Sequence, residues 1–299
     1  MRVVTVPHYL DEKAFDTLAG EIGAWPPAGR LLFDARATRW SSPFGFTALL
    51  TAGEALRAQG AEPPRLAVPD NEDVSGYWAK AGFFEHARSF FELHGRIPRR
   101  PTADASDVLL PVTPVRASQD VHDVVGRIQE QAARILTSEL HLEARATMRF
   151  SMALSEACTN VVEHAGTGGW VAVHAYTWRR RLGRRVVVIA VSDGGVGFRQ
   201  SLEPTEAKKY GERWGDAAAL EAALIHNVSR FRDPGRGQGL AAIRRFLTAW
   251  NGKISIRSGT ARLAIVPPWD DDPPLEDGLA YFPGAQVQIV IPAQDLAAA

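Results

Sequence analysis

The first hundred residues alternate between short apolar strands and amphipathic helices. The spacing of apolar positions predicts strands at Arg2–Pro7, Leu31–Asp34 and Leu66–Pro69. It predicts helices at Glu12–Trp25, Phe44–Gln59 and Val74–His86. Strands that alternate with helices indicate a small layered α/β domain, which we assign to residues 1–95.

The pattern changes after a stretch without apolar periodicity. Arg96–Asp107 is rich in Pro, Arg, Ala and Ser, and we expect a linker over residues 96–117. Beyond it, helices are predicted at Gln119–Leu136, Leu142–Ala165, Asp216–Asn227 and Leu240–Trp250. Strands are predicted at Trp170–Trp178, Arg185–Ser192, Lys253–Ser258, Arg262–Val266 and Gln286–Ile291. Because the helices are grouped, residues 118–299 are expected to form an α/β sandwich with helices on one face of a mixed sheet.

Composition narrows the class of protein. The chain has 299 residues, 34 basic and 34 acidic, so it lacks the positive field expected of a nucleic-acid-binding protein. No apolar run is long enough for a membrane span, and the N-terminus lacks the apolar core of a signal peptide. The single cysteine, Cys158, excludes a disulfide framework. We expect a cytoplasmic protein with no nucleic-acid or membrane partner.

The common nucleotide-binding fingerprints are absent, but two glycine clusters remain. The sequence contains no Walker P-loop, no dinucleotide fingerprint and no protein-kinase signature. Asp193–Gly197 follows a strongly apolar strand, and Gly235–Leu240 precedes an amphipathic helix. Taken alone, each cluster is typical of an ordinary turn or loop, because glycine tolerates positive φ.

A polar stripe on a predicted helix favours a binding site. Glu156, Asn160 and His164 recur every four residues and therefore share one helix face, whereas Leu154 and Val161 supply apolar packing. Polar side chains on a largely buried helix require partners, since an unpaired buried polar group costs about 1–3 kcal/mol.

Together, three segments resemble the motifs of the Bergerat-fold ATPases, which include DNA gyrase, the Hsp-type chaperone, histidine kinases and mismatch-repair ATPases. Glu156–Ala165 resembles the N box, Asp193–Gly197 the D-x-G-x-G box, and Gly235–Leu240 the second glycine box. The run E-A-x-x-N-x-x-E-H-A is most similar to that of the anti-sigma-factor serine kinases.

The resemblance implies ATP and Mg²⁺ as cofactors and a role for each matching residue. Asn160 would hold Mg²⁺ through its side-chain oxygen. Glu156 would act as the catalytic general base. Asp193 would accept a hydrogen bond from the adenine amino group, with Gly195 and Gly197 allowing close approach of the backbone. The remaining expected ATP-binding residues are His164, Gly235, Gly237, Gly239 and Leu240, the glycines opening a helix N-terminus toward the phosphates.

The resemblance also implies a lid over residues 199–234, and it is incomplete at one position. Lys208, Lys209, Arg230 and Arg232 lie in the lid and are mostly expected to be solvated. Ala285 stands where the family's late G-T-x-V signature has threonine, so that hydroxyl's hydrogen bond to the nucleotide site is missing. Thr260 lies too far upstream to replace it.

The N-terminal domain resembles the STAS domains of anti-anti-sigma factors over Leu31–Asp34 and Trp40–Gly45. Ser41 matches the phosphorylated serine of that family and is a candidate phosphoacceptor. Trp40 and Pro43 replace the family's Asp and Gly. We therefore favour a structural role, in which Ser41 or Ser42 caps the helix that starts near Phe44.

These observations predict an ATP-binding regulatory protein, similar to anti-sigma-factor kinases, that phosphorylates a protein serine or changes its affinity for a partner. The expected partner is a regulatory protein of STAS or sigma-factor type. Association of the chain into a homodimer is a further possibility. One alternative is an ATP-hydrolysing conformational switch, as in the chaperone and gyrase relatives. Those relatives use a transducer domain after the ATPase domain, and none is expected in Ala293–Ala299 after the last predicted strand. Another alternative is a non-catalytic nucleotide-binding interaction module.

Overall fold

The N-terminal domain of the computed structural model contains a parallel sheet backed by helices. The structure describes residues 1–99, 107–138, 144–179, 182–228 and 239–294. The sheet has the order β1-β3-β5-β6, with strands at Arg2–Thr5, Leu31–Asp34, Arg65–Ala67 and Glu92–His94. The helices are α1 (Ala14–Ile22), α2 (Pro43–Ala58), α3 (Glu72–Lys80) and α4 (Phe83–Ala87). A small parallel pair joins β2 (Tyr9–Leu10) to β4 (Trp40–Ser41).

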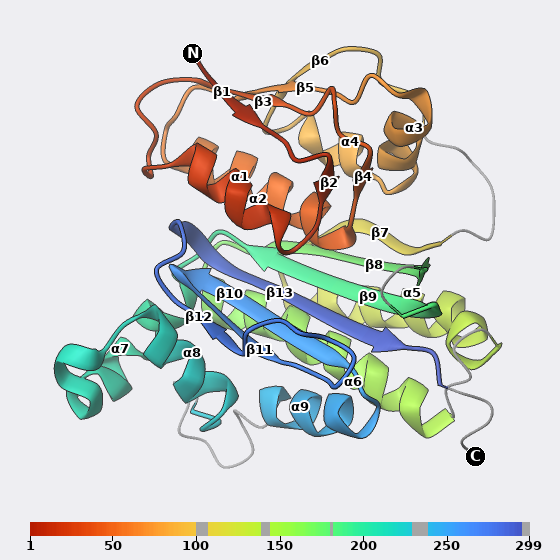
Figure 1. The fold of residues 1–299 in the computed structure, drawn as a ribbon, viewed down its shortest axis with the longest axis vertical. Helices are drawn as coiled ribbons and strands as arrows, with labels where there is room; N and C mark the ends of the chain where they lie inside the picture. Colours follow the sequence, from red (N-terminus) through yellow and green to blue (C-terminus); the bar gives the residue numbers. More distant parts are fainter. Residues whose placement is uncertain (100–106, 139–143, 180–181, 229–238, 295–299) are drawn as a thin grey trace.

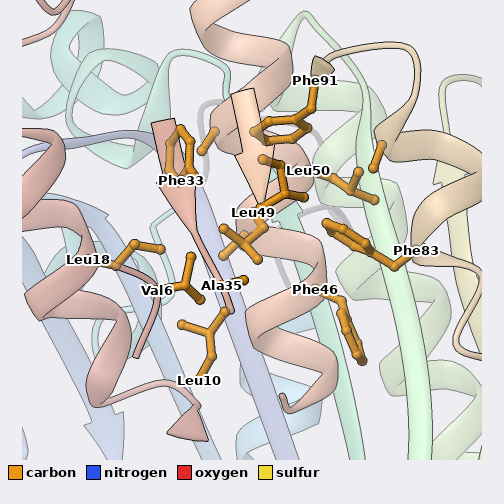
Figure 2. Packing of buried hydrophobic residues seen from close by; sticks show 14 of the residues in the cluster. Val6, Leu10, Leu18, Phe33, Ala35, Phe46, Leu49, Leu50, Phe83 and Phe91 are labelled. Carbon is orange, nitrogen blue, oxygen red and sulfur yellow. The ribbon is translucent and has the colours of Figure 1, made fainter. Parts of the chain in front are cut away.

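Aliphatic and aromatic side chains form the core of this domain. Figure 2 shows Phe33 of β3 and Leu49 and Leu50 of α2 within the same cluster, close to Phe91. The Phe33 and Phe91 rings meet edge to face at 5.6 Å. A small layered α/β domain is thus present, as the alternating pattern predicts.

The C-terminal domain is built on a large sheet with the order β12-β11-β10-β13-β9-β8-β7. These strands are β7 (Val108–Val115), β8 (Gly169–Trp178), β9 (Arg184–Asp193), β10 (Lys253–Gly259), β11 (Ala261–Ile265), β12 (Leu275–Glu276) and β13 (Phe282–Pro292). All the pairings between them in the described residues are antiparallel, so the expectation of a mixed sheet is wrong. Edge strand β7 lies inside the stretch 96–117 that was expected to be a linker.

One face of the large sheet is covered by helices of the same domain. These are α5 (Ser118–Ser138), α6 (Ala144–Asn160) and α9 (Gly239–Ala249). In Figure 1, α6 and α9 lie below the sheet, and α5 packs against α6 and edge strand β7. Phe150 of α6 and Leu247 of α9 are fully buried with Ile189 of β9 and Ile289 of β13. The helices α7 (Gly197–Tyr210) and α8 (Asp216–Leu224), joined by a short 3₁₀ turn at Gly211–Arg213, lie at one end of the sheet.

The N-terminal domain covers the other face of the large sheet. In Figure 1, α1 and α2 lie between the two sheets, so the molecule has four layers of alternating sheet and helix. Trp170, Ala172, Ala190 and Phe282 of the large sheet belong to the same buried cluster as the N-terminal core. Both faces of β8 and β9 are therefore buried.

Ion pairs add to this apolar contact between the domains. The Asp16 carboxylate on α1 binds the Arg257 guanidinium and the Arg262 guanidinium, each at 2.8 Å. The Lys253 ammonium is buried among the carboxylates of Glu12, Asp270 and Asp272.

In the parts of the chain that the structure describes, no helix meets the length and hydropathy needed to cross a membrane.

Candidate nucleotide site

Helix α6 carries two of the predicted polar residues toward the sheet. It ends at Asn160 and continues as a π-helical turn, Val161–Ala165, which Gly166 terminates at φ 74°. Single π-helical turns often occur at functional sites. Glu156 and Asn160 are one turn apart, and both are partly buried and line the same pocket. Burial raises the pKa of the Glu156 carboxyl, and the nearby Glu163 carboxylate raises it further.

Strand β9 brings Asp193 to the same pocket. Asp193 is the last residue of the strand, and its Oδ1 accepts a hydrogen bond from the Gly195 N–H at 2.9 Å. Burial raises the pKa of Asp193 to about 7, although backbone donors at Gly195 and Ala285 act in the opposite direction. The carboxyl retains acceptor capacity for a further donor.

Two glycines after Asp193 are required by the local backbone. A Cβ atom on Gly195 would overlap the carbonyl group of Ala165, which ends the π-helical turn. Gly197 has φ +69°, and a Cβ atom there would meet the Ser258 hydroxyl. The glycines therefore allow the D-x-G-x-G segment to lie against the N-box turn and β10.

A single pocket brings the predicted motifs together. Glu156 and Asn160 from α6 line it with Asp193 and Gly197 from the end of β9. The other lining residues are Ala157, Val161, Ala165, Val191, Phe198, Ser201, Leu202, Ala223, Val228, Leu240, Ile243, Ala285 and Val287. The lining is apolar with a few polar groups, as is usual for small-molecule sites.

The remaining predicted residues have different positions. Gly239 is the first residue of α9, and Leu240 beside it lines the pocket. His164 belongs to the π-helical turn, but the placement of its side chain lies outside the description. Gly235, Gly237, Arg230 and Arg232 lie outside the described residues.

The lid predicted over residues 199–234 includes most of α7 and all of α8. Lys208 and Lys209 are exposed on α7, where the Lys209 ammonium pairs with the Glu206 carboxylate at 2.7 Å. Sequence reasoning missed Phe198, Ser201 and Leu202, which bring the first turns of α7 against the pocket. Their only sequence signal was their position directly after the D-x-G-x-G motif.

The hydroxyl groups of Ser41, Ser42 and Thr260 each form a hydrogen bond within the protein. The Ser42 side chain caps α2 by accepting a hydrogen bond from the Gly45 N–H at 3.1 Å, which confirms the predicted cap. Ser41 is fully buried, and its hydroxyl donates to the Ser42 carbonyl oxygen. The Thr260 hydroxyl donates to the Asp216 carboxylate at 2.8 Å, so it is committed to α8.

Comparison with known proteins identifies a family for the C-terminal domain. Residues 146–294 match the model of the histidine kinase-, DNA gyrase B-, and HSP90-like ATPase family. The C-terminal domain therefore belongs to the Bergerat-fold superfamily of ATP-binding domains. A comparison with curated proteins finds no match.

Proposed function

We propose that the pocket binds Mg²⁺-ATP, and that the protein uses it to phosphorylate a serine on a separate regulatory protein or to change its affinity for that protein. The observation that carries this proposal is the joint lining of one pocket by Glu156, Asn160 and Asp193. These residues come from two segments that resemble motifs of the family, and they lie within the range that the family model matches.

The side chains in the pocket suit different parts of the nucleotide. The Asp193 carboxyl is buried at an apolar wall, where it can accept a hydrogen bond from the adenine amino group. The Asn160 amide oxygen is a suitable hard ligand for Mg²⁺. The N-terminus of α9 at Gly239 opens next to Leu240 of the pocket, and backbone N–H groups there favour a phosphate.

Glu156 suits the role of general base. Burial raises the pKa of its carboxyl, and a carboxylate of higher pKa accepts a proton more readily. It would remove the proton from an attacking water or serine hydroxyl. Bound Mg²⁺ would neutralise charge on the phosphates.

A serine on a separate chain suits phosphoryl transfer better than Ser41. Ser41 is fully buried, and its hydroxyl already donates to the carbonyl oxygen of Ser42, the residue that caps α2. A regulatory protein of STAS or sigma-factor type is the partner we propose, in line with the similarity of the N box to anti-sigma-factor kinases.

Calorimetric titration with ATP, ADP and GTP, each with and without Mg²⁺, tests the binding step. We expect ATP and ADP to bind, GTP to bind much more weakly, and Mg²⁺ to tighten the binding of ATP. The Asp193→Asn variant should lose adenine nucleotides while keeping its circular dichroism spectrum. Equal affinity of wild type and variant for ATP would contradict the assignment of the site.

A further inference from the structure

Helix α2 of the N-terminal domain contacts the strand end that carries Asp193. The Thr51 hydroxyl and the Ser192 hydroxyl lie 2.9 Å apart and are both buried. Ser192 is the residue directly before Asp193 on β9. One hydrogen bond thus connects the N-terminal domain to the backbone beside the proposed adenine-binding carboxyl.

Helix α2 also lies close to Gly194, the residue directly after Asp193. A Cβ atom on Gly194 would lie 3.3 Å from the Ala55 methyl and 3.4 Å from a Thr51 methyl. With glycine at this position, the loop backbone lies close to α2, with room for little more than one methyl group between them. A shift of the loop away from α2 would separate the Thr51 and Ser192 hydroxyl groups.

A third residue of α2 is connected to the segment that follows the N box. The Glu54 carboxylate accepts a hydrogen bond from the Trp170 indole at 2.7 Å and pairs with the Arg116 guanidinium at 2.7 Å. Arg116 lies over the Trp170 ring and also donates to the carbonyl oxygen of Thr167 at 3.1 Å. Thr167 follows the π-helical turn that ends the N box.

We propose that α2 holds the adenine side of the nucleotide site in position, with Thr51 as a positioning residue, so that contact with the N-terminal domain and binding of adenine nucleotide depend on each other. This inference rests on the proposed function. Any change in nucleotide affinity caused by the N-terminal domain must be matched by an equal effect of nucleotide on the domain contact, because binding linkage is reciprocal.

The proposed role of Thr51 depends on its hydroxyl group and not on the volume of its side chain. Removing the Thr51 hydroxyl leaves the Ser192 hydroxyl buried without this partner, which favours conformations in which β9 and its loop move to satisfy it. Such movement displaces Asp193. Asn160 belongs to α6, which this hydrogen bond does not touch, so the Mg²⁺ ligand should stay in place.

The test compares Thr51→Val with Thr51→Ser and Thr47→Val by titration with ATP and ADP. Thr47 is a matched control, since it is buried on the same helix but donates to Phe44 of that helix. We expect Thr51→Val to weaken ATP and ADP equally, by about fivefold or more, in the range usual for coupled sites. The factor by which Mg²⁺ tightens ATP should stay the same. Thr51→Ser should restore the affinity.

Hydrogen exchange of the wild-type protein supplies an independent test that does not need a folded variant. ATP should slow amide exchange in α2, residues 43–58, as well as at the pocket. Suppose that the wild type binds ATP, that ATP does not change amide exchange in α2, and that Thr51→Val and Thr47→Val have the same ATP affinity. This result would overturn the inference about α2 but not the proposed function. Absence of ATP binding by the wild type would overturn the proposed function together with the inference.

Discussion

Ser258 lies directly opposite Ala285 where β10 pairs with β13. Paired residues on neighbouring strands point to the same face of a sheet, and Ala285 lines the pocket on that face. The Ser258 hydroxyl donates to the Gly284 carbonyl oxygen at 2.9 Å and accepts from the Phe198 N–H at 3.1 Å. The hydroxyl next to position 285 therefore holds β13 and the start of α7 together.

The first prediction concerns the hydroxyl missing at position 285. Ala285→Thr should tighten ATP binding by up to about tenfold, because one added hydrogen bond contributes about 0.5–1.5 kcal/mol. Ala285→Val, which adds similar bulk without a hydroxyl, is the control and should not tighten it. Titration of both variants checks this, and equal affinities would show that the hydroxyl has no role here.

The second prediction concerns the pH dependence of stability. Burial raises the pKa of Asp193 to about 7, above the usual value near 4 in an unfolded chain. The folded protein then binds this proton more tightly than the unfolded chain, so this contribution to stability is present below about pH 4 and is lost as the pH rises through about 7.

Without nucleotide, Asp193→Asn should therefore unfold at a higher temperature than wild type at pH 8, with a smaller difference at pH 5. The same variant should bind ATP weakly at both values. Calorimetric unfolding scans measure the first effect, and Asp73→Asn, which changes an exposed carboxyl on α3, is the control. A variant less stable than wild type at pH 8 contradicts the role of burial.

The third prediction separates the two polar residues of α6. Glu156→Gln should retain ATP but reduce phosphoryl transfer or hydrolysis by about 10²–10⁴-fold, as expected for loss of a general base. Asn160→Ala should instead lose the effect of Mg²⁺ on ATP affinity. Steady-state turnover and titration distinguish them. Unchanged turnover in Glu156→Gln would exclude its role as base.

The fourth prediction is that Ser41 stays unmodified. Ser41 is fully buried, so its hydroxyl is not accessible for phosphoryl transfer in the folded protein. After incubation with labelled ATP, mass spectrometry should find no stoichiometric phosphate at Ser41. Label on Ser41 that disappears in Glu156→Gln would make the chain a kinase of its own N-terminal domain, contrary to this expectation.

The fifth prediction concerns the contact between the domains. Asp16→Asn leaves the buried Arg257 guanidinium without its carboxylate, which should cost about 3 kcal/mol of unfolding free energy. Asp34→Asn breaks a more exposed pair with Arg36 and should cost less than about 1 kcal/mol. Chemical denaturation measures both values. Equal losses would mean that the buried pair contributes little.

Local sequence patterns predict the bounds of an element well where apolar spacing and helix capping agree. The strand at Leu31–Asp34 has the predicted bounds, and α2 begins at Pro43, directly after its Ser42 cap. The predicted helix Val74–His86 is divided into α3 and α4, because Gly82 adopts φ 78° between them. Strand β7 was missed because Pro111 and Pro114 interrupt it, and proline is tolerated in a strand at the edge of a sheet.

The stacking of the two domains was not predictable from hydrophobic pattern. Lys253 and Arg257 look like surface residues in the sequence, yet both are buried against the N-terminal domain. Their burial depends on the carboxylates of Glu12 and Asp16, which come from the other domain at the far end of the sequence. The motifs, in contrast, lie near the ends of elements that the sequence does predict.

The position of α2 between the two sheets bears on the order in which the chain is made. Thirteen of its sixteen residues are buried, and part of that burial comes from β8 and β9, which are more than a hundred residues later in the chain. Because domains generally fold from the N-terminus during synthesis, the first domain leaves the ribosome with an uncovered apolar helix face. Translation of roughly five to twenty residues per second leaves that face open for several seconds. A pause in translation before β9 is complete would lengthen the period in which this face stays uncovered.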